Sequence, residues 1–340
     1  MKNTLTLILT LLVLTQATSA QSSDSSNYFL NLGILQKQER KFLSASKLFD
    51  QAIAADTKNI KAYIESALVN LEMKRPTMAI SNFEKANNLD SKNELVIKNL
   101  AELYFNFKNY SLAIQFAKAC KNCENSTRII GLSLFAMEEY PQAEKMLLTL
   151  NNGKDEDPQV LYTLGRGYLN MDEYDKAIVY YEKAVIVDPT KSIWIYELGL
   201  IYYNQQKFAN AVTSFEKAAA AGYPQSLNFK ENLGYAAIES GQYEKGENLL
   251  MEISSKKTGN TSIIRDLTLM FYQKKLYDKS LTYCQLLLEK NPNDAKALYQ
   301  AGLNFQHKGE KEKGQKMCDK AIEMEPALES LKKKKEMPGM

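Results

Sequence analysis

Residues 158–191 read PQVLYTLGRGYLNMDEYDKAIVYYEKAVIVDPTK, and this stretch decides the fold. Its apolar and small side chains recur at helical intervals in two groups. The first group is Leu161, Leu164, Gly165 and Tyr168, and the second is Tyr174, Ala177, Tyr181 and Ala184. Pro189 closes the stretch because proline cannot continue a helix. The pattern predicts two antiparallel amphipathic helices in 34 residues.

The same pattern recurs along the chain as a column of small residues. Its members are Ala45, Ala79, Ala113, Ala143, Ala177, Ala211, Gly246, Ser280 and Gly314, with gaps of 34, 34, 30, 34, 34, 35, 34 and 34. A second column stands twelve residues earlier: Gly33, Ala67, Ala101, Gly131, Gly165, Gly199, Gly234, Thr268 and Gly302. Small residues allow helices to approach to about 8 Å. Such a period indicates a stack of helical hairpins, in which each unit buries its apolar face on its neighbours.

With these columns the chain resembles the tetratricopeptide repeat family, whose motif places aromatic, small and proline residues at set points of a helical hairpin. The resemblance covers about residues 26–326. It implies an all-α fold, a right-handed α-solenoid of about nine hairpins. The expected units are 26–59, 60–93, 94–123, 124–157, 158–191, 192–225, 227–260, 261–294 and 295–326. Residues 21–25 are expected to form a flexible leader, and 327–340 a capping helix with a basic tail.

The first twenty residues have the composition of a secretory signal peptide. Lys2 precedes the apolar run Leu5–Leu14, and small residues end the segment at Ala20. Ten apolar residues are too few for a transmembrane helix, which needs about 20. We therefore expect cleavage after Ala20 and a periplasmic or secreted protein without membrane insertion.

Charge and side-chain chemistry argue against several functions. The formal net charge is +3, with acidic and basic residues interleaved, so the sequence predicts no nucleic-acid partner. The chain has one histidine, His307, so no metal site is expected. No phosphate-binding loop or nucleophile–base pair stands out, so we expect no cofactor and no enzymatic activity.

The four cysteines fall into two pairs. Cys120 and Cys123 end the second helix of the shortened third unit and are a candidate disulfide. A redox role is disfavoured, because the dipole at a helix C-terminus opposes a thiolate. Alternatively, Cys120 fills a slot that alanine occupies in other units. Cys284 and Cys318 share that slot in adjacent units, too far apart to bridge, and are expected to be buried thiols.

Two further glycines depart from the repeat. Gly246 and Gly314 replace alanine inside the second helices of the seventh and ninth units. Glycine costs a helix about 1 kcal/mol relative to alanine. The sequence therefore predicts local weakness at both units.

The resemblance implies that first helices line a concave face that binds a protein or peptide partner. Nine residues are expected to contact it: Tyr162, Arg166, Tyr196, Tyr203, Asn232, Tyr235, Arg265, Tyr272 and Tyr299. Tyrosine and arginine suit protein recognition, although several of the tyrosines could instead pack one repeat on the next. The expected function is an exported, non-catalytic scaffold. The alternative is a structural or assembly subunit of a cell-envelope machine for secretion, motility or wall assembly. The sequence leaves the oligomeric state open.

Overall fold

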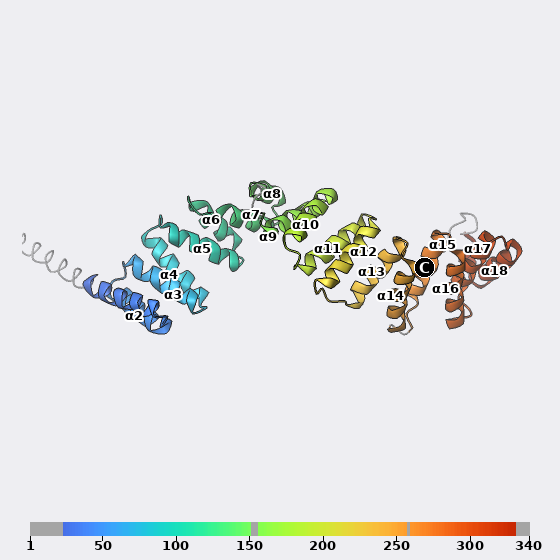
Figure 1. Ribbon diagram of the computed structural model, residues 1–340, viewed down its shortest axis with the longest axis horizontal. Coiled ribbons are helices and arrows are strands. Elements are labelled where there is room, and N and C mark those ends of the chain that lie inside the picture. The colour runs from blue at the N-terminus through green and yellow to red at the C-terminus, as the bar shows by residue number, and fades with distance from the viewer. Residues whose placement is uncertain (1–22, 151–155, 257–258, 331–340) are drawn as a thin grey trace, which may run out of the picture. The chain divides into compact units, whose positions relative to one another are not determined.

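The computed structural model describes residues 23–150, 156–256 and 259–330. These residues form helices and connecting turns and contain no strand (Figure 1). The predicted signal peptide lies outside the described residues. Among the described helices, none is both long and apolar enough to cross a membrane.

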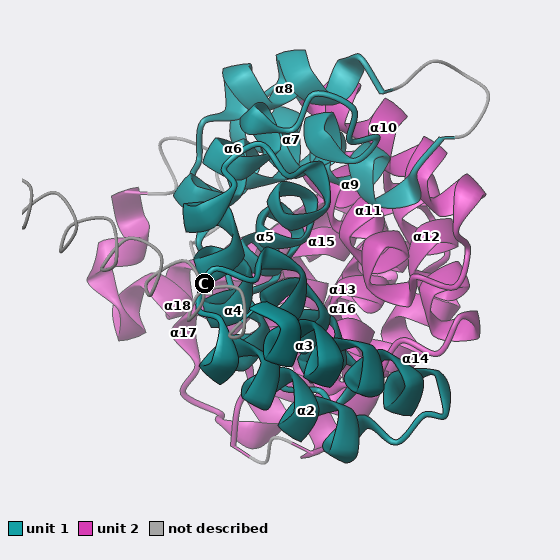
Figure 2. Ribbon diagram, turned by 90° about the vertical axis from the view of Figure 1, so that its left-hand side faces the viewer, with its two compact units in different colours: residues 1–173 teal, residues 174–340 magenta. Residues whose placement is uncertain are grey.

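The chain divides into two compact units, residues 1–173 and 174–340, coloured separately in Figure 2. In the first unit, a helix over residues 23–38 precedes eight labelled helices. They are α2 (Phe42–Ala55), α3 (Ile60–Glu72), α4 (Pro76–Leu89), α5 (Glu94–Asn106), α6 (Tyr110–Ala119), α7 (Ser126–Ala136), α8 (Tyr140–Leu148) and α9 (Pro158–Asn170).

The second unit continues the hairpin pattern. Its elements are α10 (Tyr174–Val187), α11 (Ser192–Asn204), α12 (Phe208–Ala220), α13 (Leu227–Glu239), α14 (Tyr243–Lys256), α15 (Ser262–Gln273), α16 (Tyr277–Lys290), α17 (Ala295–His307), α18 (Lys311–Met324) and the 3-10 turn η1 (Pro326–Leu328). The all-α class and the helical-hairpin repeat predicted from the sequence are confirmed.

Each hairpin buries its apolar residues against its neighbour. In the second unit, Ile238 of α13 and Leu250 of α14 form one buried cluster with Ile263 and Leu267 of the following helix α15. Such stacking leaves no single central core, because every hairpin completes the apolar surface of the adjacent one. The predicted small columns lie at these contacts, and Ala45, Ala79, Ala113, Ala177 and Ala211 are fully buried.

The two exceptional glycines lie at close contacts between helices, so a packing reason for glycine stands beside the predicted local weakness. A Cβ atom at Gly246 would lie 2.7 Å from the Gly234 carbonyl oxygen and 2.6 Å from Ile238 Cγ1. At Gly314 a Cβ atom would collide with the Gly302 carbonyl oxygen. Glycine is required at both points because the two helices of each hairpin approach too closely for a side chain.

The turns inside the hairpins share a backbone feature that the sequence patterns did not reveal. The middle residue of each three-residue connection has a positive φ. These residues are Arg40, Lys74, Lys108, Glu138, Asp172, Gln206, Gly241, Lys275 and Gly309. The left-handed conformation ends a helix and redirects the chain into the next one. Most of these residues are not glycine, so a glycine search misses them.

Tyrosine–glutamate hydrogen bonds tie neighbouring hairpins together. The Tyr168 hydroxyl donates to Glu144 at 2.7 Å, and Tyr202 donates to Glu182. Burial, followed by the hydrogen bond to Glu182, raises the pKa of Tyr202 to about 12. The phenol therefore remains a proton donor at neutral pH.

The ends of the array differ from the prediction. The chain is already helical at residues 23–25, inside the segment 21–25 expected to be a flexible leader. The reason is local packing: the buried Ser26 hydroxyl donates to the Ala52 carbonyl at 2.7 Å and accepts from Asn59 at 2.8 Å. At the other end, η1 and helical residues 329–330 begin the expected capping segment, and the rest lies outside the described residues.

Candidate partner-binding face

Seven of the nine predicted contact residues belong to first helices of the second unit. Helix α11 carries Tyr196 and Tyr203, α13 carries Asn232 and Tyr235, α15 carries Arg265 and Tyr272, and α17 carries Tyr299. Six of the seven are partly exposed. We call these seven residues the first-helix face.

The two remaining predicted residues belong to α9 in the first unit. The Arg166 guanidinium lies 5.4 Å from the centre of the Phe135 ring and 5.8 Å from that of Tyr162. Arg166 is exposed and Tyr162 is partly buried. This cation–π arrangement places a positive charge at the surface beside two aromatic rings.

Polar groups on the first-helix face are linked across adjacent hairpins. The Asn232 amide donates to the Tyr196 hydroxyl at 2.8 Å, and the Tyr196 ring stacks on Tyr223 with centroids 4.2 Å apart. The Tyr235 hydroxyl donates to Asp266 at 2.6 Å. Part of the binding capacity predicted for this face is therefore used to hold one repeat on the next.

Tyr203 and Tyr235 keep their protons at neutral pH. Burial raises the pKa of Tyr235, and its hydrogen bond to Asp266 raises it further. Burial also raises the pKa of Tyr203, with a smaller contribution from the charges of Glu239 and Asp266. These hydroxyls are neutral hydrogen-bonding groups beside carboxylates, which makes the centre of the face amphipathic.

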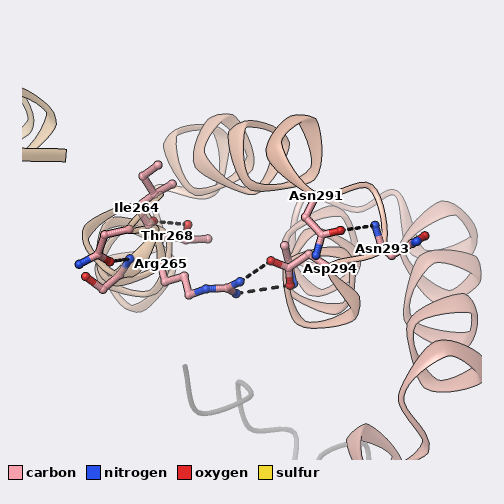
Figure 3. Close-up of polar contacts among 9 residues, drawn as sticks. Ile264, Arg265, Thr268, Asn291, Asn293 and Asp294 are labelled. Atoms are coloured by element: carbon pink, nitrogen blue, oxygen red, sulfur yellow. Dashed lines mark hydrogen bonds and ion pairs between the residues drawn. The ribbon is translucent and has the colours of Figure 1, made fainter. Parts of the chain in front are cut away.

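Arg265 has a structural partner. Its guanidinium pairs with the Asp294 carboxylate, whose side chain is 6% exposed (Figure 3). Asp294 also accepts the Ala297 backbone N–H at 3.0 Å and so caps α17. The first unit contains the same arrangement. Arg128 Nε lies 2.5 Å from Asp157 Oδ2, and Asp157 caps α9 by accepting the backbone N–H of Gln159. Each arginine therefore joins a first helix to the start of the next first helix.

Tyr299 departs from its predicted position. It is 2% exposed and packs in a buried cluster with Cys318 and Leu328. The prediction that it lies open to a partner is wrong, because the turn η1 brings Leu328 against the last hairpin. Tyr299 also lines a pocket beside α17 and α18.

The sequence prediction missed three apolar residues that lie on the same first helices. Leu200, Leu269 and Leu303 are partly exposed and stand four residues after Tyr196, Arg265 and Tyr299 on their helices. They share the repeat column of Arg166 and Tyr235. Their regular spacing along the repeat is the signal that identifies them, whereas the prediction rested on aromatic and polar residue types.

Comparisons with known proteins agree with the helical repeat. Three segments match the tetratricopeptide repeat family: residues 158–191, 196–252 and 295–328. The chain contains tetratricopeptide repeats. The C-terminal part of a TPR repeat-containing protein from Cytophaga hutchinsonii has a similar structure, with a TM-score of 0.52 and 18% identity over 70% of this chain and 99% of that one. At this identity the likeness shows the fold alone.

Two curated proteins are similar in sequence over part of their length. The peroxisomal targeting signal receptor of Saccharomyces cerevisiae is 23% identical over 243 residues, which are 67% of this chain and 39% of the relative. The protein O-mannosyl-transferase TMTC3 of Homo sapiens is 26% identical over 168 residues, 47% of this chain and 18% of the relative. The chain thus spans less than half the length of each.

The cysteines have two different environments in the helical array. Cys120 is the C-cap of α6, and its sulfur is in bonding contact with that of Cys123; their Cα atoms are 5.6 Å apart. Cys284 and Cys318 are buried free thiols, as predicted. Burial raises the pKa of Cys284 to about 12, which keeps the thiol protonated and unreactive.

Within the described residues, no group of three or more histidine, cysteine, aspartate or glutamate side chains could hold a metal ion. The first-helix face offers aromatic rings and neutral hydroxyls, and the neighbouring Leu200 and Leu269 add aliphatic side chains. Side chains of these kinds are enriched in surfaces that recognise other proteins.

Proposed function

We propose that the protein is an exported, non-catalytic scaffold that binds a protein or peptide along the first-helix face. A tetratricopeptide repeat architecture is consistent with protein–protein interaction. The observation that carries the proposal is the half-exposed row of Tyr203, Tyr235 and Tyr272, supplemented by Leu200 and Leu269. Aromatic and aliphatic residues in a row give broad apolar contact, while the hydroxyls give direction.

The proposed partner is an extended segment or a surface helix with apolar side chains. Tyr203 and Tyr272 occupy the same column in their repeats, and Leu200 and Leu269 stand three residues before them. A ligand that follows the repeats therefore meets an aliphatic and an aromatic contact on both α11 and α15. Carboxylates of Glu239 and Asp266 add polar contacts beside the rings.

Site-specific photo-crosslinking in the native cell tests the binding face. A photoreactive amino acid is placed at Tyr203 or Tyr272, and the matched controls carry it at Thr213 or Thr282, which are exposed on the second helices α12 and α16. We expect a discrete adduct from the first pair and none from the second. Equal adducts from all four positions, or adducts from the threonine positions alone, would contradict the proposal.

Export is tested separately by the N-terminus of the protein that accumulates in the cell. We propose that it begins at Gln21, after removal of residues 1–20. Edman degradation or intact-mass measurement of the purified chain decides this. A mature protein that keeps Met1 or Lys2 would refute export by this signal and leave the binding face unaffected.

A further inference from the structure

Two partly exposed tyrosines of the first-helix face lie close to one carboxylate. Tyr203 belongs to α11, Tyr235 to α13 and Asp266 to α15, so the side chains come from three consecutive first helices. The Tyr235 hydroxyl donates to Asp266 Oδ2 at 2.6 Å. Burial, and then the charges of Glu239 and Asp266, raise the pKa of Tyr203, so Asp266 is near this phenol as well. We call Tyr203, Tyr235 and Asp266 the tyrosine–aspartate site.

The charge of Asp266 is not neutralised by a lysine or arginine of the described residues. Helix α11 contains neither residue type. The cations carried by α13, by α15 and by the C-cap of α15 hold other carboxylates. These pairs are Lys230–Glu252, Arg265–Asp294 and Lys274–Glu239. Asp266 is therefore left with the neutral Tyr235 hydroxyl as its hydrogen-bond donor.

The equivalent carboxylate at the start of the array is neutralised by the chain itself. Glu65 of α3 stands two residues before the small residue of its helix, as Asp266 does in α15. Lys37 Nζ, on the helix over residues 23–38, lies 2.7 Å from Glu65 Oε2. The residue of α13 at the register position of Lys37 is Ile238, which is fully buried. The chain thus supplies a cation to Glu65 and none to Asp266.

The chemistry of the tyrosine–aspartate site favours a cation from another molecule. Aromatic rings attract cations to their faces, and a carboxylate forms strong, charge-assisted hydrogen bonds with ammonium and guanidinium groups. Within the described residues, no lysine or arginine lies over the ring of Tyr203 or Tyr235. An acidic side chain at the same place would be repelled by Asp266. The site therefore discriminates between partners by the sign of their charge.

We propose that the partner is a basic peptide segment that places a lysine or arginine side chain in the tyrosine–aspartate site. The cationic group contacts the two rings and pairs with the Asp266 carboxylate. Apolar residues on either side of this cation meet Leu200 of α11 and Leu269 of α15. The inference rests on the proposed function, because it specifies the chemistry of a ligand that binds the first-helix face.

Selection of peptides on the purified full chain tests the proposal. The probe is a phage-displayed library of random peptides of about ten residues, long enough when extended to cross three first helices about 8–10 Å apart. We expect the recovered peptides to share one lysine or arginine between apolar residues. Asp266→Asn keeps an acceptor for the Tyr235 hydroxyl but removes the charge, so its peptides should lack the shared basic residue. Glu289→Gln, at an exposed position of α16, is the matched control and should leave the selection unchanged.

Titration calorimetry with one recovered peptide measures the proposed ion pair. Replacing the basic residue of the peptide by norleucine should weaken binding to the unmodified chain about tenfold. The two peptides should bind Asp266→Asn with nearly equal affinity. Asp266→Arg should reverse the selection, so that the library yields acidic peptides. A variant that merely fails to fold cannot produce such a reversal.

The outcomes separate this inference from the proposed function. Recovered peptides without a basic residue, whose binding is lost when Tyr203 and Tyr272 are replaced by alanine, would overturn the inference and support the binding face. A basic residue recovered equally on the unmodified chain and on Asp266→Asn would also overturn the inference. Failure to recover any peptide that depends on Tyr203 and Tyr272 would overturn the binding face itself, and this inference with it.

Discussion

Alanine at position 246 should destabilise the protein, although helix propensity alone predicts the opposite. Propensity favours alanine over glycine by about 1 kcal/mol in a helix interior. The added Cβ, however, would lie 2.7 Å from the Gly234 carbonyl oxygen and 2.6 Å from Ile238 Cγ1. Overpacking of this kind costs about 1–3 kcal/mol. Because one of the obstacles is backbone, we expect Gly246→Ala to lower stability by about 1 kcal/mol.

Gly167→Ala supplies the matched control. Gly167 also lies in a helix, but a Cβ there would meet only the Phe135 ring, at 3.9 Å, which is ordinary contact. This substitution should therefore raise stability by about 0.5–1 kcal/mol. The two variants should differ in sign.

Urea denaturation and native-state hydrogen exchange measure the difference. Exchange is the sharper assay, because repeat arrays open locally and the loss should concentrate in amides of α13 and α14. A Gly246→Ala variant that gains stability to the same extent as Gly167→Ala would refute the argument from close helix approach.

Three other substitutions or measurements test separate features. Gly309→Ala should lower the stability by about 1 kcal/mol, because φ is +95° and an added Cβ would meet no atom, so the effect comes from backbone strain alone. A thermal melt measures this, and an unchanged melting temperature would contradict the strain argument. Arg265→Ala should lower the stability by about 3 kcal/mol because it leaves the Asp294 carboxylate buried without its partner. Adding Asp294→Asn should restore part of the loss. Equal stability of the unmodified chain, the single variant and the double variant would count against a structural pair. Thiol titration in denaturant without reductant should find two of the four cysteines, because Cys120 and Cys123 are expected to be bridged; four reactive thiols would show that they are not.

The repeat columns predicted the helices well because small-residue spacing is imposed by helix packing itself. The spacing of Ala45, Ala79 and Ala113 reports a contact that every hairpin makes, so it recurs in the sequence. The role of Gly246 could not be read in this way. Propensity describes an isolated helix, whereas the close approach of α13 and α14 exists only after the hairpin has formed.

The candidate site was predicted only in part for a similar reason. A column shows which side of a helix a residue occupies, and it correctly placed Tyr203 and Tyr272 at partly exposed positions. It does not show which side chains reach across to a neighbouring hairpin. Arg265 meets Asp294 29 residues later, the same interval that separates Arg128 from Asp157. That repeated interval is the signal that could have revealed the pair.

The positive-φ turns are positions at which substitution by glycine would raise the free energy of unfolding. Each non-glycine residue in the left-handed conformation lowers the stability by about 1–2 kcal/mol relative to glycine. Glycine at an exposed position such as Lys74 or Gln206 would recover part of this without disturbing either helix. Because every hairpin stacks only on its neighbours, such gains would accumulate along the array. Single-codon changes at these turns could thus adjust the working temperature of the protein and leave its surfaces for other molecules unaltered.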